Sequence, residues 1–171
     1  MNEQELRLHR CCFTGHRPEK LKRMEEEVKK SLEKAILKAI DDGYTTFITG
    51  MARGVDIWAG QIVLKLRQTN PELRLIDALP YPGCDSRWSA SWRKQHADVL
   101  EAADLIQSIS PQYSMVSFQK RDEWMVDHVA RVIAYTMACR VERRTPLSMQ
   151  TNVELRLYMH EEWPISFEFF S

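Results

Sequence analysis

The sequence predicts an α/β domain in which a parallel sheet carries helices on both faces. Short apolar segments alternate along the chain with longer segments whose apolar residues recur at helical spacing. Glycine follows the first two short segments, where a strand of such a sheet turns toward a helix. The 171 residues, 44% hydrophobic and 28% charged, are enough for one globular domain of ordinary composition.

The first strand and helix form the clearest unit. Residues 6–13 are an extended apolar segment that ends at Gly15, so we predict a strand followed by a loop. Residues 28–40 then repeat apolar side chains among Lys and Glu at the spacing of an amphipathic helix, and Gly43 follows as a stop signal.

The same order of strand, glycine loop and helix occurs a second time. Residues 45–49 are β-branched or aromatic and end at Gly50, which predicts a short strand. Trp58, Ile62 and Leu66 then recur every four residues, which predicts a helix.

Three more strands complete the predicted sheet. Residues 73–79 form a strand that the turn 80–83 ends, and residues 88–103 place aromatic and apolar side chains on one helical face. The remaining elements of the alternation are a strand over 104–109, a helix over 114–128 and a strand over 129–135. Any ligand of such a sheet is expected at the carboxyl ends of its strands.

The last part of the chain departs from this pattern. Residues 135–171 show no clear alternation of strand and helix, carry three Arg within 140–144 and include the aromatic segment 167–170. All six glycines lie at or before Gly83, although turns in α/β domains commonly use glycine. We therefore predict one domain over 1–134 and an atypical segment over 135–171.

Charge and cysteine content exclude several classes of protein. Lys plus Arg and Asp plus Glu both number 24, so the net charge is zero and favours neither a nucleic-acid nor a membrane partner. The acidic start lacks the basic and apolar regions of a signal peptide, so a cytoplasmic protein is expected. The four cysteines form no CxxC pair, and we expect reduced, mostly buried thiols with no metal site and no bound cofactor.

Two loops carry residue types that bind anions. Residues 13–21 read FTGHRPEKL and residues 49–56 read TGMARGVD. Glycine permits close backbone approach, N–H groups at a helix start bind phosphate, and Arg17 and Arg53 each offer a bidentate grip. Neither loop matches the Walker A or the GxGxxG motif. For one loop alone, a simple turn with a solvated arginine explains the pattern equally well, but two equivalent loops favour an anion site.

These loops resemble the YpsA-like branch of the SLOG superfamily, a Rossmann-like family that includes the DNA-processing protein DprA and the LOG phosphoribohydrolases. The similarity covers residues 7 to about 134 and includes Trp92, SPQY at 110–113 and RDEWMVD at 121–127. The resemblance implies a Rossmann-like sheet and a site for a nucleotide or a nucleotide-derived small molecule. The ligand-binding residues that we expect are Thr14, Gly15, His16, Arg17, Gly50, Met51, Ala52, Arg53, Gly54, Asp56, Pro80, Tyr81, Arg121 and Asp127.

The roles of several of these residues stay open. Asp56 is expected to cap the second helix, and the alternative is a hydrogen bond to a ribose hydroxyl. His16 contacts phosphate or transfers a proton, and binding is the safer interpretation because no nucleophile is fixed by spacing. Arg121 is either a ligand contact or an exposed arginine on a helix surface.

Aromatic and acidic neighbours of the expected pocket add two further expectations. Tyr81 or Trp88 could stack on a base, although packing is the favoured role of the tryptophans. Asp122 stands where the family usually has Asn. It places an acidic group beside the pocket, so we expect weaker binding of an anionic ligand.

The resemblance ends after the fifth predicted strand. LOG relatives have a Pro-Gly-Gly segment there, with a catalytic Glu and a phosphate-binding helix start, whereas residues 133–140 read IAYTMACR. Codons can be chosen for residues 137–158 that, read one base out of frame, encode such a segment. A frameshifted, loosely attached segment over 135–171 is therefore one hypothesis, and a divergent tail is the other.

We conclude from the sequence that the protein binds a nucleotide or a nucleotide-derived ligand, and whether it catalyses a reaction stays open. The first alternative is an N-glycosidic or phosphoester hydrolase of the LOG type, which the missing Pro-Gly-Gly segment disfavours. The second is a DprA-like binder of single-stranded DNA, which the zero net charge disfavours. The third is a regulatory protein that has lost its ligand. Homo-oligomerisation stays open, and no membrane partner is expected.

Overall fold

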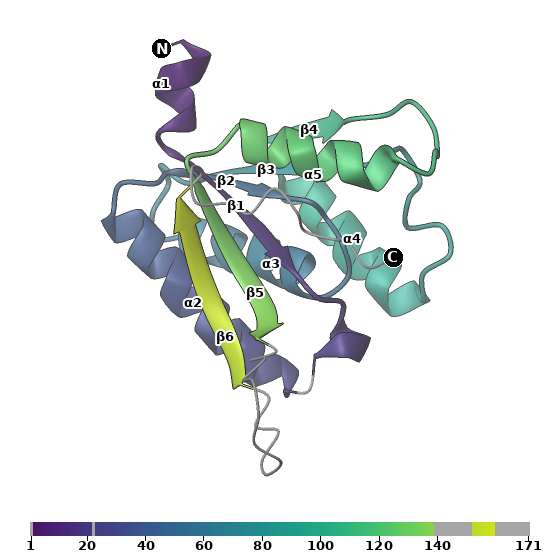
Figure 1. The fold of residues 1–171 in the computed structure, drawn as a ribbon, viewed down its shortest axis with the longest axis horizontal. Coiled ribbons are helices and arrows are strands. Elements are labelled where there is room, and N and C mark those ends of the chain that lie inside the picture. Colours follow the sequence, from purple (N-terminus) through teal and green to yellow (C-terminus); the bar gives the residue numbers. More distant parts are fainter. Residues whose placement is uncertain (1, 22, 139–151, 160–171) are drawn as a thin grey trace, which may run out of the picture.

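In the described part of the chain, the sheet has five parallel strands and one antiparallel strand. The computed structural model describes residues 2–21, 23–138 and 152–159. The strand order is β4-β3-β2-β1-β5-β6, with β6 antiparallel to β5 and all other neighbours parallel (Figure 1). The strands are β1 (Arg10–Gly15), β2 (Thr46–Thr49), β3 (Arg74–Leu79), β4 (Leu105–Ser108), β5 (Arg131–Ala138) and β6 (Asn152–Met159). The predicted α/β, Rossmann-like parallel sheet is confirmed.

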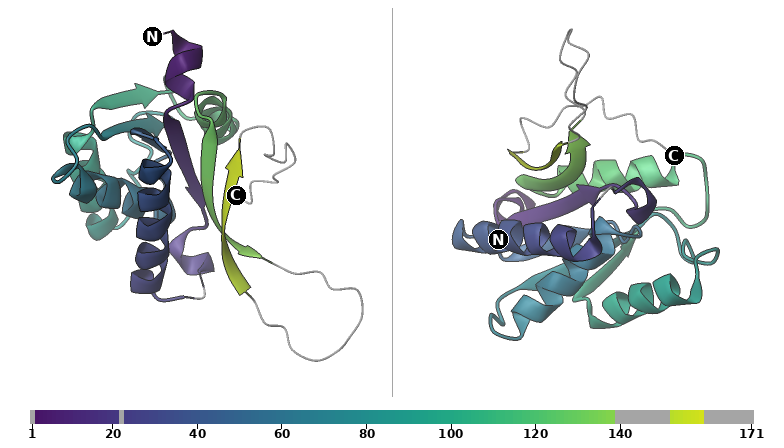
Figure 2. Two further views of the ribbon diagram at one scale, coloured as in Figure 1. Left: turned by 90° about the vertical axis from the view of Figure 1, so that its left-hand side faces the viewer. Right: turned by 90° about the horizontal axis from the view of Figure 1, so that it is seen from below.

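Helices lie on both faces of this sheet, as predicted. Figure 2 shows α2, α3 and α4 on one face and α5 on the other. The helices are α1 (Glu3–Arg7), α2 (Glu25–Asp41), α3 (Val55–Arg67), α4 (Ala90–Ala102) and α5 (Ser117–Asp127), with a short 3₁₀ turn at Pro18–Lys20. None of the helices in the described part of the chain is long and apolar enough to cross a membrane.

Alternation along the strands builds two apolar layers. In β1, Phe13 packs under α2 and stacks on Phe47 with ring centroids 5.7 Å apart. Cys11 belongs to the same layer, whereas Cys12 belongs to the layer under α5 with Val132. The two adjacent cysteines therefore face opposite sides of the sheet, as their positions in a predicted strand required.

The chain path creates one switch point in the sheet. From β1 the chain moves outward through β2, β3 and β4 by way of α2, α3 and α4, and it returns by α5 to β5 on the other side of β1. The loop after β1 therefore leads to α2 on one face of the sheet, whereas the neighbouring strand β5 is reached from α5 on the opposite face. Open α/β sheets bind ligands at such a point.

The predicted elements differ from the structure by a few residues at their ends, and hydrogen bonds at a helix start explain two of these differences. The segment predicted as a strand over 6–13 begins as helix α1, because Asn2 and Glu5 form a capping box at its start, and β1 begins only at Arg10. Helix α4 begins at Ala90, after Trp88, because the hydroxyl of Ser89 accepts a hydrogen bond from the N–H of Trp92 and caps the helix there.

Strand β6 has no counterpart among the predicted elements. Its sequence NVELRLYM alternates polar and apolar residues, which is the pattern of a strand with one buried face. The backbone register places Leu157 opposite Ile133 and Leu155 opposite Tyr135. The predicted domain boundary after residue 134 stays a prediction, since β5 continues to Ala138 and residues 139–151 and 160–171 lie outside the described residues.

Candidate functional site

The loops after β1 and β2 pack directly against each other at the carboxyl edge of the sheet. Gly54 has a φ of +92°, a left-handed conformation that glycine adopts without strain. A Cβ atom at Gly54 would lie 2.8 Å from Cδ of Pro18 and 3.2 Å from the carbonyl oxygen of His16. Both the backbone conformation and the contact between the loops therefore require glycine at this position.

Gly15 brings the end of β1 against the start of α3. A Cβ atom there would lie 2.6 Å from Cγ2 of Val55, the first residue of that helix. The helix itself starts at Gly54 without a side-chain cap. Among the described residues, no hydrogen bond occupies the N–H groups of Val55 and Asp56, whereas the N–H of Ile57 donates to the carbonyl oxygen of Ala52 at 3.3 Å.

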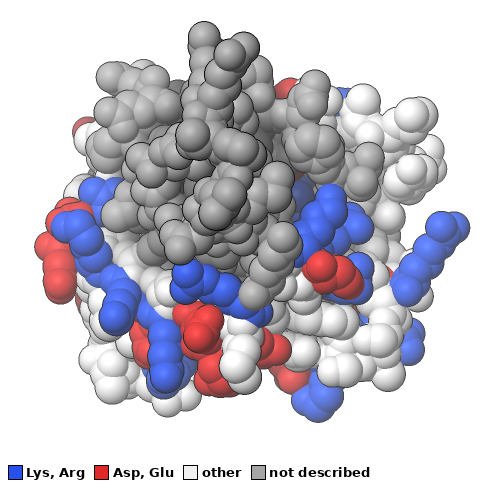
Figure 3. Space-filling view, turned by 60° about the horizontal axis from the view of Figure 1, so that its bottom comes forward, with Lys and Arg blue, Asp and Glu red and all other residues white. Residues whose placement is uncertain are grey.

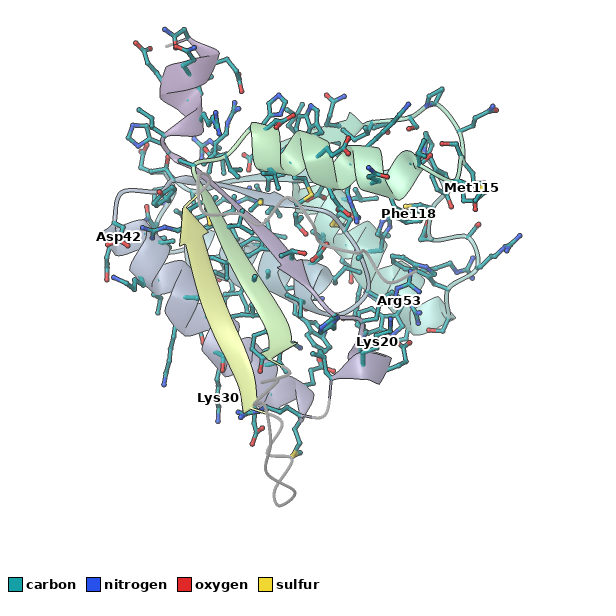
Figure 4. The ribbon with its side chains drawn as sticks, viewed as in Figure 1. Lys20, Lys30, Asp42, Arg53, Met115 and Phe118 are labelled. Carbon is teal, nitrogen blue, oxygen red and sulfur yellow. The ribbon has the colours of Figure 1, made fainter. Side chains whose placement is uncertain are left out.

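The arginines of the two loops have different surroundings. The guanidinium of Arg53 pairs with the Glu19 carboxylate at 2.8 Å and lies 5.9 Å from the ring of Trp88. Arg17 is exposed: its carbonyl oxygen accepts a hydrogen bond from the N–H of Lys20 at 2.9 Å, but no hydrogen bond or ion pair joins its guanidinium to another described residue. The pair with Glu19 joins Arg53 to the first loop, and Figure 4 labels Arg53 and Lys20 at the same end of the sheet. The contact between the loops is established, and a cleft shared by both guanidinium groups stays a prediction.

Asp56 holds the second loop in shape. Its carboxylate accepts a hydrogen bond from the N–H of Ala52 at 3.4 Å, and its carbonyl oxygen accepts one from the Thr49 hydroxyl at 2.9 Å. Burial raises the pKa of Asp56 to about 7, although the nearby Arg121 guanidinium lowers it. The expected capping role is wrong, because Gly54 occupies the cap position and Asp56 bonds the loop that precedes it.

Met51 is the strained residue of this loop. It is buried and has a φ of +57°, which side chains other than glycine seldom adopt. Its N–H donates to the Thr49 hydroxyl at 3.3 Å. The contacts of Thr49 and Asp56 thus keep the loop in a conformation that costs free energy locally, which is typical of ligand-binding loops.

Arg121 ties α5 to the second loop. It is only 7% exposed, so the alternative of an exposed arginine on a helix surface is wrong. One terminal N–H donates to the carbonyl oxygen of Gly50, and its Nε–H donates to Oδ1 of Asp122 at 2.8 Å. A Cβ atom at Gly50 would lie 2.9 Å from the Arg121 guanidinium and 2.8 Å from Oδ2 of Asp56.

Asp122 is partly enclosed beside this arginine. Burial raises its pKa, and the ion pair with Arg121 opposes that change. Because Arg121 offsets part of the carboxylate charge, the penalty that we expected for an anionic ligand is smaller than the sequence alone implies. That penalty itself stays a prediction.

Aromatic side chains gather after β3 and β4. The ring of Tyr81 makes edge contacts with Tyr113 at 5.5 Å and Phe118 at 5.9 Å, measured between centroids. The carbonyl oxygen of Pro80 accepts a hydrogen bond from the N–H of Ser110 at 3.1 Å, which joins the two loops. Met115, which is 92% exposed, lies at the outer end of this group with Phe118 (Figure 4).

Asp127, one of the expected ligand-binding residues, lies far from the two loops. Asp127 ends α5 at the opposite edge of the sheet, since Ala130 soon after it donates to the carbonyl oxygen of Arg10 at the start of β1. The structure does not bring Asp127 together with the loops.

His16 is half-buried, and its burial together with nearby Lys20 lowers its pKa, so its ring is neutral at pH 7.

A pocket lies on the α5 face of the same edge. It is small, with a cavity volume of about 20 Å³, and it is partly open to solvent. Its walls come from β1, β5 and α5, so it occupies the switch point of the sheet. The lining residues are Cys12, Phe13, Thr14, Asp122, Met125, Val126 and Val132.

The charge around this edge is mixed. Figure 3 shows Lys and Arg side chains interspersed with Asp and Glu, with no continuous basic surface among the described residues in view. Pairs such as Arg53 with Glu19 account for part of this pattern. A groove that follows a nucleic-acid backbone needs a continuous positive surface, which the described residues in this view do not form.

Comparison with known proteins gives a family match. The model of the YspA SLOG family matches residues 11–138. A UPF0398 protein of Halalkalibacterium halodurans is 35% identical over 101 residues, which are 58% of this chain and 53% of that protein. A UPF0398 protein of Shouchella clausii is 26% identical over 135 residues, 74% of this chain and 72% of that protein. One of Ligilactobacillus salivarius is 27% identical over 105 residues, 60% of this chain and 57% of that protein. In the first and third comparisons the chain spans little more than half of the relative's length.

Proposed function

The chain belongs to the YspA SLOG family, and we propose that it binds a nucleotide or a nucleotide-derived small molecule at the carboxyl edge of its parallel sheet. The observation that carries this proposal is the close packing of two glycine loops at the start of α3. A Cβ atom at Gly54 would collide with Pro18, so the two loops present one continuous backbone surface. Backbone N–H groups at such a surface bind phosphate.

The uncapped start of α3 supports an anionic ligand. Because Gly54 offers no side-chain oxygen, the N–H groups of Val55 and Asp56 have no hydrogen-bond acceptor among the described residues, whereas that of Ile57 donates to the Ala52 carbonyl oxygen. The positive end of the helix dipole points in the same direction. Phosphate is the group of a nucleotide that satisfies both features.

Two arginines add charge to this surface. Arg17 has an unpaired guanidinium among the described residues, and Arg53 is held by an exposed carboxylate that a phosphate can replace. Arg121 is different, since its hydrogen bonds to Gly50 and Asp122 leave it a positioning role. We therefore assign direct phosphate contacts to Arg17 and Arg53.

The test is calorimetry and thermal shift with AMP, ADP, ATP, NAD and ADP-ribose. A ligand that binds only the folded protein raises the unfolding midpoint by an amount that grows with the logarithm of its concentration relative to Kd. We expect Arg17→Ala and Arg53→Ala each to weaken binding by about 1.5 to 3 kcal/mol, the range for hydrogen bonds to charged groups. Arg74→Ala, at the amino end of β3, is the matched control. Failure of every nucleotide to bind would refute the proposal.

A further inference from the structure

Tyr81, Tyr113 and Phe118 form an aromatic group at the carboxyl edge of the sheet, and part of this group faces solvent. The side chain of Tyr113 is 62% exposed and that of Phe118 is 37% exposed. Figure 4 labels Phe118 and the exposed Met115 on the same side of the molecule as Arg53. Adjoining exposed apolar side chains at this edge of an α/β sheet are typical of a binding surface.

Hydrogen bonds hold the loop that carries Tyr113 in a fixed shape. The side chain of Ser117 is buried, and its hydroxyl accepts a hydrogen bond from the N–H of Ser114 at 2.9 Å. The N–H of Ser110 donates to the carbonyl oxygen of Pro80 at 3.1 Å, which ties this loop to the loop after β3. The exposed ring of Tyr113 is therefore presented by an ordered loop, which lowers the entropy cost of binding a ligand.

The rings of this group have different surroundings. Tyr81 lies nearly perpendicular to both Tyr113 and Phe118, with interplanar angles of 75° and 86°, and it packs between the two loops. Trp88, the other residue that we expected to stack on a base, has the Arg53 guanidinium 5.9 Å from its ring. Tyr113 and Phe118 are therefore the exposed rings, and Tyr81 positions them.

The strand order places the aromatic group near the surface to which we assign phosphate. The second glycine loop follows β2, whereas the aromatic group follows β3 and β4, which are the next two strands of the sheet. Neighbouring strands lie about 4.8 Å apart, so the two surfaces are separated by one to two strand spacings, on the order of 5 to 10 Å. The ribose of a nucleotide spans a gap of this size between phosphate and base.

Arg121 connects the two surfaces directly. Its guanidinium donates to the carbonyl oxygen of Gly50 in the second loop and lies 5.8 Å from the ring of Phe118. One buried side chain thus contacts both the loop and the aromatic group, and it keeps them in a fixed relation to each other.

From these contacts we infer that the base of a bound nucleotide stacks on Tyr113 and Phe118 while its phosphate lies at the two glycine loops. The inference rests on the proposed function and names the class of ligand as phosphate esters that carry an aromatic base, in preference to sugar phosphates without one. Stacking uses the flat face that every base has, so we expect weak discrimination among bases. Neither stacking residue belongs to the set that the sequence predicts.

The experiment measures binding of AMP, ADP, ATP, NAD and ADP-ribose to the full chain by calorimetry, with ribose 5-phosphate as the reference that lacks a base. We expect the nucleotides that bind to lose affinity by about 5-fold to 150-fold in Tyr113→Ala or Phe118→Ala, the range for a base stacked on an aromatic side chain. The affinity for ribose 5-phosphate should stay unchanged in both variants. Tyr113→Phe keeps the ring and should keep the affinity for nucleotide.

The control is Leu105→Ala, which removes an apolar side chain of similar exposure at the amino end of β4 and should not change nucleotide affinity. If an alanine variant fails to fold, it also loses ribose 5-phosphate, and Tyr113→Phe together with the comparison of AMP and ribose 5-phosphate on the wild type then decides the question.

Three results would count against these proposals. Equal binding of AMP and ribose 5-phosphate by the wild type, or full nucleotide affinity in both alanine variants, would overturn the inference and leave the proposed function standing. Weaker self-association of Tyr113→Ala in sedimentation, with nucleotide affinity unchanged, would identify the aromatic group as a contact between copies of the chain and also overturn the inference. If no nucleotide binds, both proposals fail together.

Discussion

The guanidinium of Arg121 on α5 donates a hydrogen bond to the carbonyl oxygen of Gly50 in the loop before α3. These residues come from elements on opposite faces of the sheet, 71 positions apart in sequence. A Cβ atom at position 50 would lie within 3 Å of both Arg121 and Asp56. One contact therefore fixes the second loop against the element that closes the pocket, and it depends on glycine at position 50.

Replacement of Arg121 by Ala should destabilise the protein by about 1.5 to 3 kcal/mol. The Gly50 carbonyl oxygen would lose its side-chain donor, and the partly enclosed Asp122 carboxylate would lose its ion pair. Arg121→Lys should recover only part of the loss, because one ammonium group cannot match the fork that reaches both oxygens. Denaturant unfolding measures the difference, with the exposed Arg93→Ala as control. Equal stability of Arg121→Ala and the control would show that the contact contributes nothing.

Gly54→Ala should cost more stability than Gly43→Ala, although both glycines have nearly the same positive φ. Their φ values are +92° and +94°, so both positions favour glycine, and the ψ of −122° at Gly54 lies outside the left-handed helical region and adds strain for alanine. A Cβ atom at Gly43 has open space around it, whereas one at Gly54 collides with Pro18. Gly54→Ala therefore loses stability through both strain and collision, and the affinity for nucleotide tests the contact between the loops.

The readouts for this pair are the free energy of unfolding and the affinity for nucleotide. Gly43→Ala should keep full affinity, and Gly54→Ala should lose it because the first loop is displaced from α3. Equal losses of stability in the two variants, with nucleotide affinity intact in both, would contradict the role of Gly54 in joining the loops.

Most of the fold follows from local sequence patterns. The amphipathic period of residues 28–40 and the glycines after the first two strands predict α2 and both loops at close to their actual positions. The start of the first strand is predicted too early because residues 6–8 are apolar enough for a strand, while the capping box of Asn2 with Glu5 depends on hydrogen bonds that hydrophobicity does not reveal. Strand β6 is not predicted from the sequence, because it lies outside the repeated strand and helix units and pairs antiparallel to β5.

Only the site residues that belong to short sequence motifs could be predicted from the sequence. The glycines and arginines of the two loops stand in motifs, so the sequence alone identifies them. Arg121 and Asp122 act through contacts with residues far away in sequence, and nothing in segment 121–127 indicates which of its charged groups is buried. Asp127 shares that segment, yet helix geometry carries it to the opposite edge of the sheet.

Release of Arg53 from its partner should strengthen anion binding. Glu19 pairs with Arg53 at 2.8 Å, and both side chains are partly exposed, so the pair is worth about 0.2 to 1 kcal/mol. A bound phosphate has to replace this carboxylate. Glu19→Gln should therefore raise nucleotide affinity up to about fivefold at low salt, with a smaller gain at high salt because screening weakens the original pair.

Glu33→Gln, which breaks the similar pair with Lys65 on α2 and α3, should not change affinity. Tighter binding by both variants alike would point to net charge and not to Arg53.

Asp77 should make the protein less stable as pH rises from acid toward 8. It lies in β3, fully buried, and neither carboxylate oxygen has a hydrogen-bond partner among the described residues. Burial raises its pKa from 3.8 to about 8. The folded state therefore holds a proton that the unfolded chain releases above about pH 4, so this contribution to stability is complete below pH 4 and is lost as pH approaches 8.

Asp77→Asn removes that titration, and the difference between the variant and the wild type isolates it from every other group. Urea unfolding at pH 5 and pH 8 should show the variant gaining stability relative to the wild type as pH rises, because the amide never has to be buried as an anion. Asp56, whose pKa is about 7, titrates in the same range but is present in both proteins, so its contribution cancels in the comparison. Asp98→Asn, at an exposed carboxylate paired with Lys94, should follow the wild type at both pH values. A constant difference between Asp77→Asn and the wild type across this range would mean that Asp77 is ionised in the folded protein, and a partner for its carboxylate would then have to be found.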